Sequence, residues 1–320
     1  MTKLDVHQPI SRRRALSLGS VTAAGILAGT PAAGVAAAHP RRILRQSGKL
    51  PAKVIEKIVQ AEGTVTDGVL SIDLSRDDIG DVRGPIGVTF DGSFEIDGTL
   101  TFQPLGKRLA FFNGDLALKP GETQGFIDAV LAHGLTFQAF HQHYIEMSPQ
   151  VWFIHWRGIG EPLALARAVH SVLKTTAISL PQKMPSHPTS PLDAKRLGSI
   201  LHGDAQIGDN GTITVTVTRR GRIVIGGVHA SPEANISTVV EFKPIGHAGG
   251  AAVGPDFSMT GDEVDNVVAI MRRHGWFTGC LYNQETSETP QLYFSHMLKT
   301  GDAYALAAEV RLGLDKTNAD

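Results

Sequence analysis

The sequence predicts an α+β fold built from a tandem duplication of one unit, in which helices cover one face of an antiparallel sheet. Three observations predict it: residues 115–174 align without a gap on residues 256–315, strand and helix patterns alternate in the same order in both copies, and 320 residues with 42% apolar content leave room for two cores. We therefore expect two similar domains related by a pseudo-two-fold axis.

The alignment runs at a constant offset of 141, and one frame over 60 positions is not expected by chance. Upstream the copies remain similar with small shifts, since residues 102–106 match 242–246 at offset 140 and residues 67–72 match 210–215 at offset 143. Identical pairs include Asp115 and Asp256, Glu122 and Glu263, His133 and His274, Gly134 and Gly275, Phe153 and Phe294, and His155 and His296.

These matches predict the domain boundaries. The first repeat unit, with a histidine cluster, spans 50–177, and a second, degenerate unit spans 192–318. The segment 178–191 between them contains four prolines, as expected of an extended linker. Residues 39–49 form an N-terminal segment that follows a signal peptide, 1–38.

The elements of each unit follow from periodicity. Apolar residues at 54, 55, 58 and 59 predict a short first helix, and alternating runs at 69–74 and 212–217 predict strands. The aligned block then predicts a strand, a helix from Pro120 to His133, two strands joined by a tight turn, and a helix from Glu161 to Leu173. His-Gly pairs at 133–134 and 274–275 are typical of helix ends. This order suggests a ferredoxin-like sandwich in each unit.

The first 38 residues are typical of a twin-arginine export signal. Residues 11–18 read SRRRALSL, a weakly apolar stretch follows, and Ala36-Ala37-Ala38 is a small-residue cleavage site. The stretch contains too many Gly, Ser, Thr and Pro residues for a membrane span. We expect a periplasmic or extracellular protein with no membrane span after signal removal.

Composition excludes several function classes. A net charge of -1 and 6% aromatic residues argue against a nucleic-acid partner. A single cysteine, Cys280, excludes an internal disulfide framework and a Cys-rich metal site. There is no Gly-X-Ser-X-Gly hydrolase motif and no phosphate-binding glycine loop followed by Lys-Ser/Thr.

Histidines cluster in the first unit. His141 and His143 lie two apart on a predicted strand, so both point to one side of the sheet, and His155 lies on the next strand. A three-residue turn at 148–150 would pair His143 directly with His155, whereas a two-residue turn would move His155 to the opposite face. Three converging imidazoles would suit a divalent transition metal, whether Zn, Cu, Fe, Mn or Ni.

Glu146, near the predicted turn, is a candidate fourth ligand or catalytic base, and equally a solvated loop carboxylate. In the second unit, Tyr282 and Gln284 replace the two histidines, while His296 matches His155. That unit either completes or shields a pocket on the first, or His155 and His296 share a structural role.

The stretch 109–173 contains NGDLAL (113–118), FHQH (140–143), SPQVWFIHW (148–156) and LARAV (165–169). It resembles the bacterial domain-of-unknown-function 1259 family of LpqO- and LppY-like exported proteins. The resemblance covers essentially the whole chain after the signal, and it implies an envelope-associated setting without an established reaction. Gln142, Met147 and Gln150 depart from the Asn, acidic and Arg residues that are typical of that family.

Two functions remain open on these grounds. The first is an exported protein that binds a transition metal or a small-molecule ligand at His141, His143 and His155, with metal-dependent catalysis as an extension. The second is a non-catalytic module that binds a cell-envelope component, with structural histidines.

Overall fold

The computed structural model describes residues 43–246 and 248–320, which form an α+β fold of two similarly built repeats. The predicted signal peptide, 1–38, lies outside these residues, so export by the twin-arginine route stays a prediction. In the described part of the chain, every helix is too short or too polar to cross a membrane.

The first repeat contains three helices and a six-stranded antiparallel sheet, with strand order β1-β2-β5-β6-β8-β7. Its elements are α1 (Ala52–Val59), β1 (Thr64–Thr66), β2 (Val69–Ser75), β5 (Asp97–Pro104), β6 (Ala110–Leu118), α2 (Thr123–Ala132), β7 (Thr136–His141), β8 (Trp152–Gly160) and α3 (Pro162–Leu173).

The second repeat has the same elements in the same order, and its sheet reads β9-β10-β13-β14-β17-β15 from the corresponding edge. They are α4 (Ala194–Leu201), β9 (Asp204–Ile207), β10 (Ile213–Val217), β13 (Thr238–Pro244), β14 (Gly250–Thr260), α5 (Val264–Arg273), β15 (Phe277–Thr278), β17 (Leu292–Asp302) and α6 (Ala303–Leu314). The predicted duplication and the strand-helix-strand-strand-helix order are confirmed.

Short elements fill the connections. A two-stranded sheet consists of β3 (Val82–Arg83) and β4 (Thr89–Phe90), and a three-stranded sheet of β12 (Val228–His229), β11 (Val224–Ile225) and β16 (Glu288–Thr289). Single 3-10 turns occur at Pro85–Gly87, Pro120–Glu122 and Asp209–Gly211.

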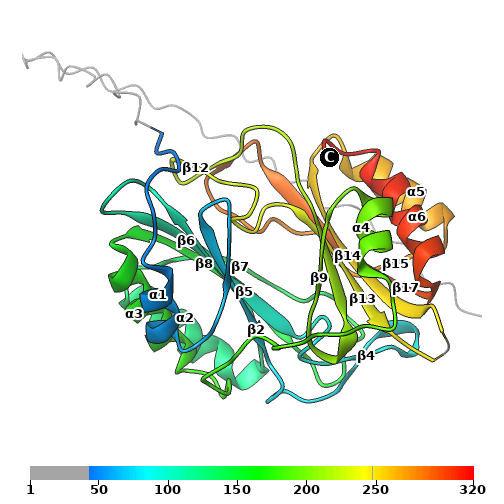
Figure 1. The fold of residues 1–320 in the computed structure, drawn as a ribbon, viewed down its shortest axis with the longest axis horizontal. Helices are drawn as coiled ribbons and strands as arrows, with labels where there is room; N and C mark the ends of the chain where they lie inside the picture. The colour runs from blue at the N-terminus through cyan, green and yellow to red at the C-terminus, as the bar shows by residue number, and fades with distance from the viewer. Residues whose placement is uncertain (1–42, 247) are drawn as a thin grey trace, which may run out of the picture. The chain divides into compact units, whose positions relative to one another are not determined.

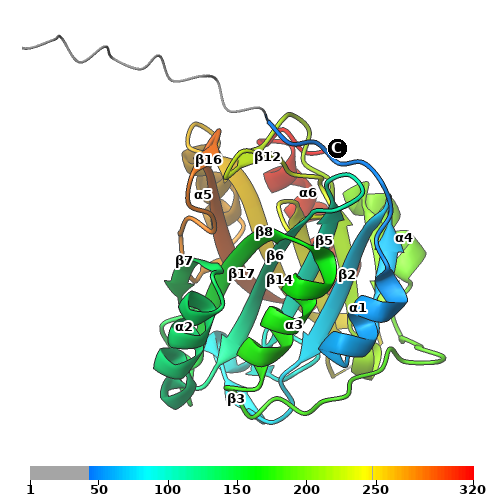
Figure 2. The ribbon, with the colours of Figure 1, turned by 90° about the vertical axis from the view of Figure 1, so that its left-hand side faces the viewer.

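Helices cover one face of each sheet, as predicted. In the first repeat, apolar residues of α1, α2 and α3 pack on alternate residues of the strands, such as Phe112, Leu116 and Trp156. In the second, α4, α5 and α6 pack in the same way on residues such as Val253 and Phe257. Figure 1 and Figure 2 show the two helical layers on opposite sides, with both sheets between them.

The other faces of the two sheets pack against each other. One apolar cluster joins Phe90, Tyr144 and Phe153 to Ala252 and Leu298 of the second repeat. Another joins Leu105 and Phe111 to residues 223–236 and to β17. Because apolar contacts seal both ends of this interface, the polar side chains between them are held in a largely buried layer.

The ends of α2 and α5 follow the prediction. His133 and His274 occupy the C-cap positions, and the glycines that follow adopt positive φ angles of 70° and 77°. Glycine accepts this left-handed conformation without a side-chain clash, so each chain turns sharply into its next strand.

The connection between β7 and β8 differs from the predicted tight turn. Residues 142–151 form a ten-residue loop, and His155 pairs with Ala139 rather than with His143. The loop is long because Tyr144, Met147 and Val151 leave the hairpin and pack in the interface between the sheets. A β-bulge near Phe137 also shifts the register, but His141 and His155 still share one face.

Candidate metal centre

A cluster of histidine and carboxylate side chains lies where the inner faces of the two sheets meet. Three elements supply its central members: Glu95 precedes β5, His143 follows β7, and His296 lies on β17 of the second repeat. All three side chains are buried. The duplication is what brings them together, since no single sheet carries the three.

The carboxylate of Glu95 is held from several sides. Tyr144 donates its hydroxyl hydrogen to Oε1 over 3.0 Å, and the backbone N–H of Glu95 donates to Glu241. Gly254 leaves room for the group, because a Cβ at that position would lie 2.2 Å from Oε1. Glu95 also adopts a left-handed backbone with φ of 66°, an unusual conformation for a long side chain that indicates a constrained position.

Two imidazoles face the same oxygen of Glu95. His143 Nδ1 lies 3.0 Å from Oε2 and His296 Nδ1 lies 3.5 Å from it. In residues 43–246 and 248–320, these three residues form the group of ligand-type atoms that lie within 4.8 Å of one another. They are therefore the candidate metal-binding set.

The two rings are stacked. His143 lies between Phe153 and His296, with ring centroids 3.3 and 3.4 Å away and interplanar angles of 7° and 19°. The lone pairs of nearly parallel rings lie in nearly parallel planes, so a shared metal ion requires the two ring planes to tilt toward each other.

Charges are balanced within this set. Burial alone would raise the pKa of Glu95, but hydrogen bonds from His143 and His296 outweigh it and lower the pKa to about 2. Burial lowers the pKa of His143 to about 3. For His296, burial is outweighed by Asp256 and Glu95, which raise the pKa above its usual value. Near neutral pH, Glu95 is thus ionised and His143 is neutral, and His296 holds its proton to a higher pH than an ordinary imidazole does.

His141 and His155 form a second, adjacent pair. Their Nε2 atoms lie 2.9 Å apart and their ring centroids 5.1 Å apart, so the rings meet head to head. Burial lowers the pKa of both, for His155 to about 3. Tyr282 stacks on His141 at 3.5 Å, and its hydroxyl lies 3.5 Å from His296 Nε2, which connects the pair to the first set.

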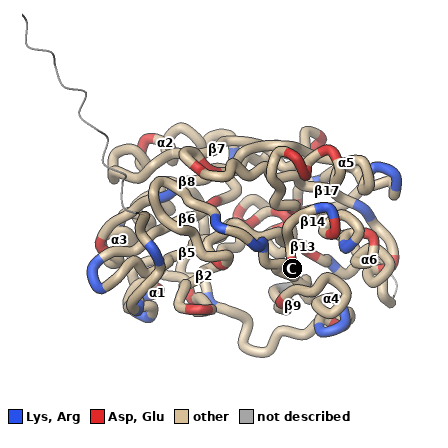
Figure 3. Tube along the Cα trace, turned by 90° about the horizontal axis from the view of Figure 1, so that it is seen from above, with Lys and Arg blue, Asp and Glu red and all other residues tan. Residues whose placement is uncertain are grey.

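Each repeat adds one aspartate. Asp115 lies opposite His155 on neighbouring strands, and Asp256 lies opposite His296 in the same way. Burial raises their pKa values to about 7 and about 6. Figure 3 shows acidic positions on strands between the two helical layers as well as on the surface.

The structure divides the sequence-predicted ligands between these two groups. His141 and His155 are in contact, whereas His143 contacts Glu95 and His296. Glu146 is exposed on the loop between β7 and β8, and its catalytic role stays a prediction. The second repeat contributes His296 to the cluster. This favours the alternative in which the second unit completes a site on the first, over a structural role shared by His155 and His296.

The sequence did not predict Glu95, Asp256 or Tyr282 as members of this cluster. Glu95 lies in an irregular segment that carries no periodic signal. The repeat offset of 140 does place it opposite Asn235, which has a φ of 62°. The available signal was this difference: one copy has Asn235, a residue type favoured in left-handed turns, where the other has Glu95.

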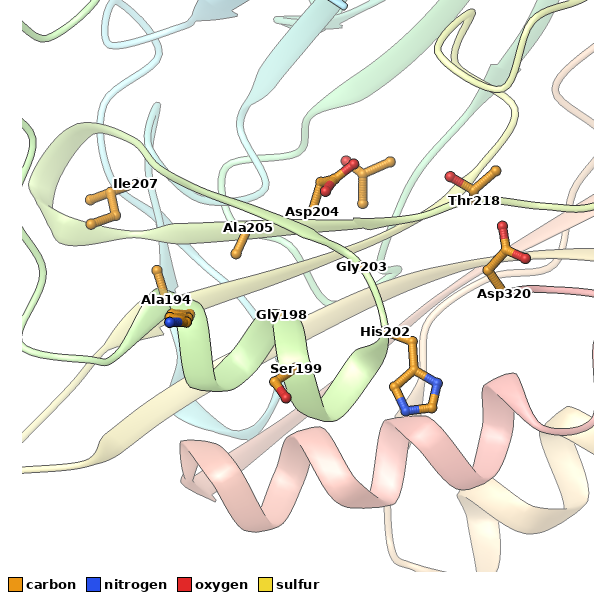
Figure 4. Close-up of a pocket in the computed structure, with 12 residues that line it drawn as sticks. Ala194, Gly198, Ser199, His202, Gly203, Asp204, Ala205, Ile207, Thr218 and Asp320 are labelled. Carbon is orange, nitrogen blue, oxygen red and sulfur yellow. The ribbon is translucent and has the colours of Figure 1, made fainter.

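The surface pockets lie elsewhere. One is formed by α4, β9 and the last residue of the chain, with Ser199, His202 and Asp204 among its lining residues (Figure 4). None of the clustered histidines lines it. The chemistry that the sequence and the structure indicate therefore belongs to the buried layer between the sheets.

Comparisons with known proteins give a family but no activity. The chain is similar to a trimeric bacterial microcompartment shell protein, PduB, at 10% identity and a TM-score of 0.20, over 79% of this chain and 89% of that one. No curated protein matches it. The family described as Domain of Unknown Function (DUF1259) matches twice, at residues 53–175 and 195–316, and the chain belongs to that family.

Proposed function

We propose that this protein binds a transition-metal ion between its two repeats, with Glu95, His143 and His296 as ligands. The observation that carries the proposal is the placement of one buried carboxylate oxygen 3.0 and 3.5 Å from two imidazole nitrogens. Two ligand atoms bound to one ion at about 2.05 Å lie about 2.9 Å apart at a right angle and about 3.3 Å apart in a tetrahedron. The observed separations are close to both values.

The protonation states also support binding. A metal ion needs an ionised carboxylate and unprotonated imidazole nitrogens. Glu95 already has a low pKa and His143 is neutral, and the raised pKa of His296 makes it the ligand that gives up its proton least readily. The Nδ1 protons that now face Glu95 occupy the place an ion would take.

The donor set indicates the kind of ion and site. Two histidines and one carboxylate occur in catalytic zinc sites and in non-haem iron sites, and three protein ligands leave coordination positions open. When bound, such an ion acts as a Lewis acid toward a ligand in an open position. Because the layer is buried, a small-molecule ligand would take that position.

The test is metal binding by the purified protein. We expect Zn²⁺ or Fe²⁺ to bind after chelator treatment and reconstitution, at least one ion per chain by elemental analysis. Glu95→Gln and His143→Gln should each weaken the metal affinity more than about 100-fold. Loss of a group that only hydrogen-bonds to a metal ligand already costs about 10- to 100-fold.

His133→Gln is the matched control, because His133 caps α2 away from the cluster. It should bind like the unaltered protein. If all variants bind metal equally, or if the unaltered protein binds none, the proposal is wrong.

A further inference from the structure

The two ring nitrogens of His296 face two different carboxylates. Nδ1 lies 3.5 Å from Oε2 of Glu95, and Nε2 lies 3.6 Å from Oδ2 of Asp256. The residue is 7% exposed, so protein groups rather than solvent decide how its ring is oriented. An imidazole that binds a metal through one nitrogen needs an acceptor for the proton on the other, and a carboxylate often serves.

Strand pairing places Asp256 beside this ring. Asp256 on β14 and His296 on β17 are direct cross-strand partners. Their chain neighbours Phe257 and Met297 pack in the core on the helical side, so the Asp and His side chains face the other sheet. Opposite side chains on antiparallel strands have Cβ atoms about 4.5 to 5.5 Å apart, within reach of a short carboxylate. The second sheet therefore sets this contact through its own register.

The Asp256 carboxylate has unused acceptor capacity. Its Oδ1 is buried and has no hydrogen-bond partner among the described residues. A buried acceptor without a partner costs about 1 to 3 kcal/mol. At 3.6 Å the contact with His296 is longer than a hydrogen bond, so a small rotation of the carboxylate or of the ring would complete it. That hydrogen bond would recover part of the cost.

Tyr282 competes for the same nitrogen. Its hydroxyl oxygen lies 3.5 Å from Nε2 of His296. A carboxylate is the stronger acceptor, since hydrogen bonds to ionised groups are about twice as strong as those between neutral groups. Stacking on His141, with ring centroids 3.5 Å apart, also holds the tyrosine ring in place. Of the two neighbours, Asp256 is therefore the better acceptor for a proton on Nε2.

We propose that Asp256 is a positioning residue of the metal site, which keeps the proton of His296 on Nε2 and leaves Nδ1 for an ion shared with Glu95. This inference rests on the proposed function, and it names a group that acts through a ligand rather than on the ion. His143 is held differently, because its ring stacks on Phe153 with centroids 3.3 Å apart. Packing thus orients one imidazole, and a carboxylate orients the other.

The first repeat contains an equivalent pair whose carboxylate is engaged elsewhere. Asp115 on β6 and His155 on β8 are cross-strand partners. Oδ1 of Asp115 accepts from the backbone N–H of Thr99 at 3.2 Å and from Nδ2 of Asn235 at 3.1 Å. Nδ1 of His155 is buried with no hydrogen-bond partner in the part of the chain that the structure describes. The duplication thus supplies a matched control, with the same residue types beside a histidine outside the proposed ligand set.

Zinc affinity at pH 7, measured by competition with a chelating dye, tests the proposal. Asp256→Asn keeps the shape of the side chain and should weaken Zn²⁺ binding about 10- to 100-fold, the range for loss of a group that orients a metal ligand. Asp115→Asn removes the same charge from the equivalent position of the first repeat. It should weaken binding less than about 10-fold, as should Tyr282→Phe.

A second readout separates positioning from a general effect on folding or charge. Long-range ¹H–¹⁵N NMR of the zinc-loaded protein should show His296 protonated on Nε2, and loss of the signal in His296→Gln identifies it. The Nε2 proton should move upfield in Asp256→Asn, because its charged acceptor is lost, and should not move in Asp115→Asn. Asp256→Glu retains a carboxylate and should keep the proton downfield, which tests the role even if Asp256→Asn does not fold.

These outcomes separate the two proposals. Equal zinc affinities of Asp256→Asn and Asp115→Asn, or an unmoved Nε2 proton in Asp256→Asn, would overturn the positioning role while the metal site itself stands. A loss of affinity in Tyr282→Phe that equals the loss in Asp256→Asn would also overturn it. If the unaltered protein binds no zinc, the proposed function is wrong and the positioning role is wrong with it. Thermal unfolding of the metal-free variants checks that each one folds.

Discussion

Replacement of Glu95 by Gln should destabilise the metal-free protein in a pH-dependent way. The side chain is 4% exposed, so solvent does little to screen its contacts. Gln preserves the shape and removes the charge that accepts from His143 and pairs with His296. Glu and Gln tolerate the left-handed backbone at position 95 equally poorly, so the substitution does not change the backbone strain there.

The magnitude follows from the pKa of Glu95, which falls from 4.5 to about 2 on folding. A depressed carboxyl pKa contributes stability that is present above about pH 4.5 and is lost as pH falls toward 2. A difference of about 2.5 pKa units corresponds to about 3 kcal/mol at pH 7. About 2 kcal/mol of this is lost by pH 3.

Urea unfolding of metal-free protein at pH 7, 5 and 3 would measure this contribution. The difference in unfolding free energy between the unaltered protein and Glu95→Gln should be about 3 kcal/mol at pH 7 and about 1 kcal/mol at pH 3. Glu146→Gln removes an exposed carboxylate and should change stability by less than about 0.5 kcal/mol at each pH. A difference for Glu95→Gln that stays constant down to pH 3 would refute the assigned ion pair.

Three further predictions concern residues around the centre. Burial raises the pKa of Glu285 to about 8, so the folded protein should lose stability as pH rises from 4.5 to 8. Between pH 6 and pH 8, the unfolding free energy in urea should fall by about 2 kcal/mol less in Glu285→Gln than in the unaltered protein. Equal falls in the two proteins would contradict this. Gly254→Ala should displace the Glu95 carboxylate and lower the free energy of unfolding by about 1 to 3 kcal/mol. Metal affinity, measured by equilibrium dialysis, should fall at least about 10-fold. The control Gly125→Ala, in α2, should raise the free energy of unfolding by about 0.5 to 1 kcal/mol without changing the affinity. Arg76→Met should lower the unfolding free energy in urea by about 3 to 5 kcal/mol, because it removes a fully buried guanidinium that pairs with both Asp78 and Glu122. A loss below about 1 kcal/mol would contradict that role.

Local sequence signals predicted the repeated scaffold well because they depend on neighbouring residues. Helix periodicity and His-Gly ends placed α2, α3 and α5 within a few residues of their bounds. The gapless alignment predicted two copies, and both sheets have the same strand order. Each of these signals acts within one turn of helix or one strand, where tertiary packing changes little.

The register between β7 and β8 depends on the other repeat, so it could not be predicted from its own residues. Tyr144 and Met147 were expected close to a tight turn, but they pack against second-repeat residues such as Leu298. The Tyr144 hydroxyl oxygen also lies 3.0 Å from the Met297 carbonyl oxygen. Burial of those side chains outweighs the cost of a longer loop, which rises only slowly with length.

The candidate centre shows the same limit at the level of chemistry. His141 and His155 could be placed on one face because strand parity is a local property. Glu95 could not be placed, because its position depends on a left-handed residue and on the space left by Gly254 across the interface. Long-range packing therefore selected which histidines meet a carboxylate.

The duplication also accounts for the asymmetry of the centre. Identical scaffolds meeting face to face would bring two copies of every ligand to the interface, with like charges opposed across it. The second repeat instead carries Asn235, Tyr282 and Gln284 at the positions of Glu95, His141 and His143. Two of these neutral side chains contact the first repeat: Asn235 donates to Asp115, and Tyr282 stacks on His141. Gln284 instead donates to the Asn235 carbonyl oxygen within its own repeat. One repeat thus supplies most of the ligands, while the other contributes His296 and Asp256 and holds the remaining groups in place.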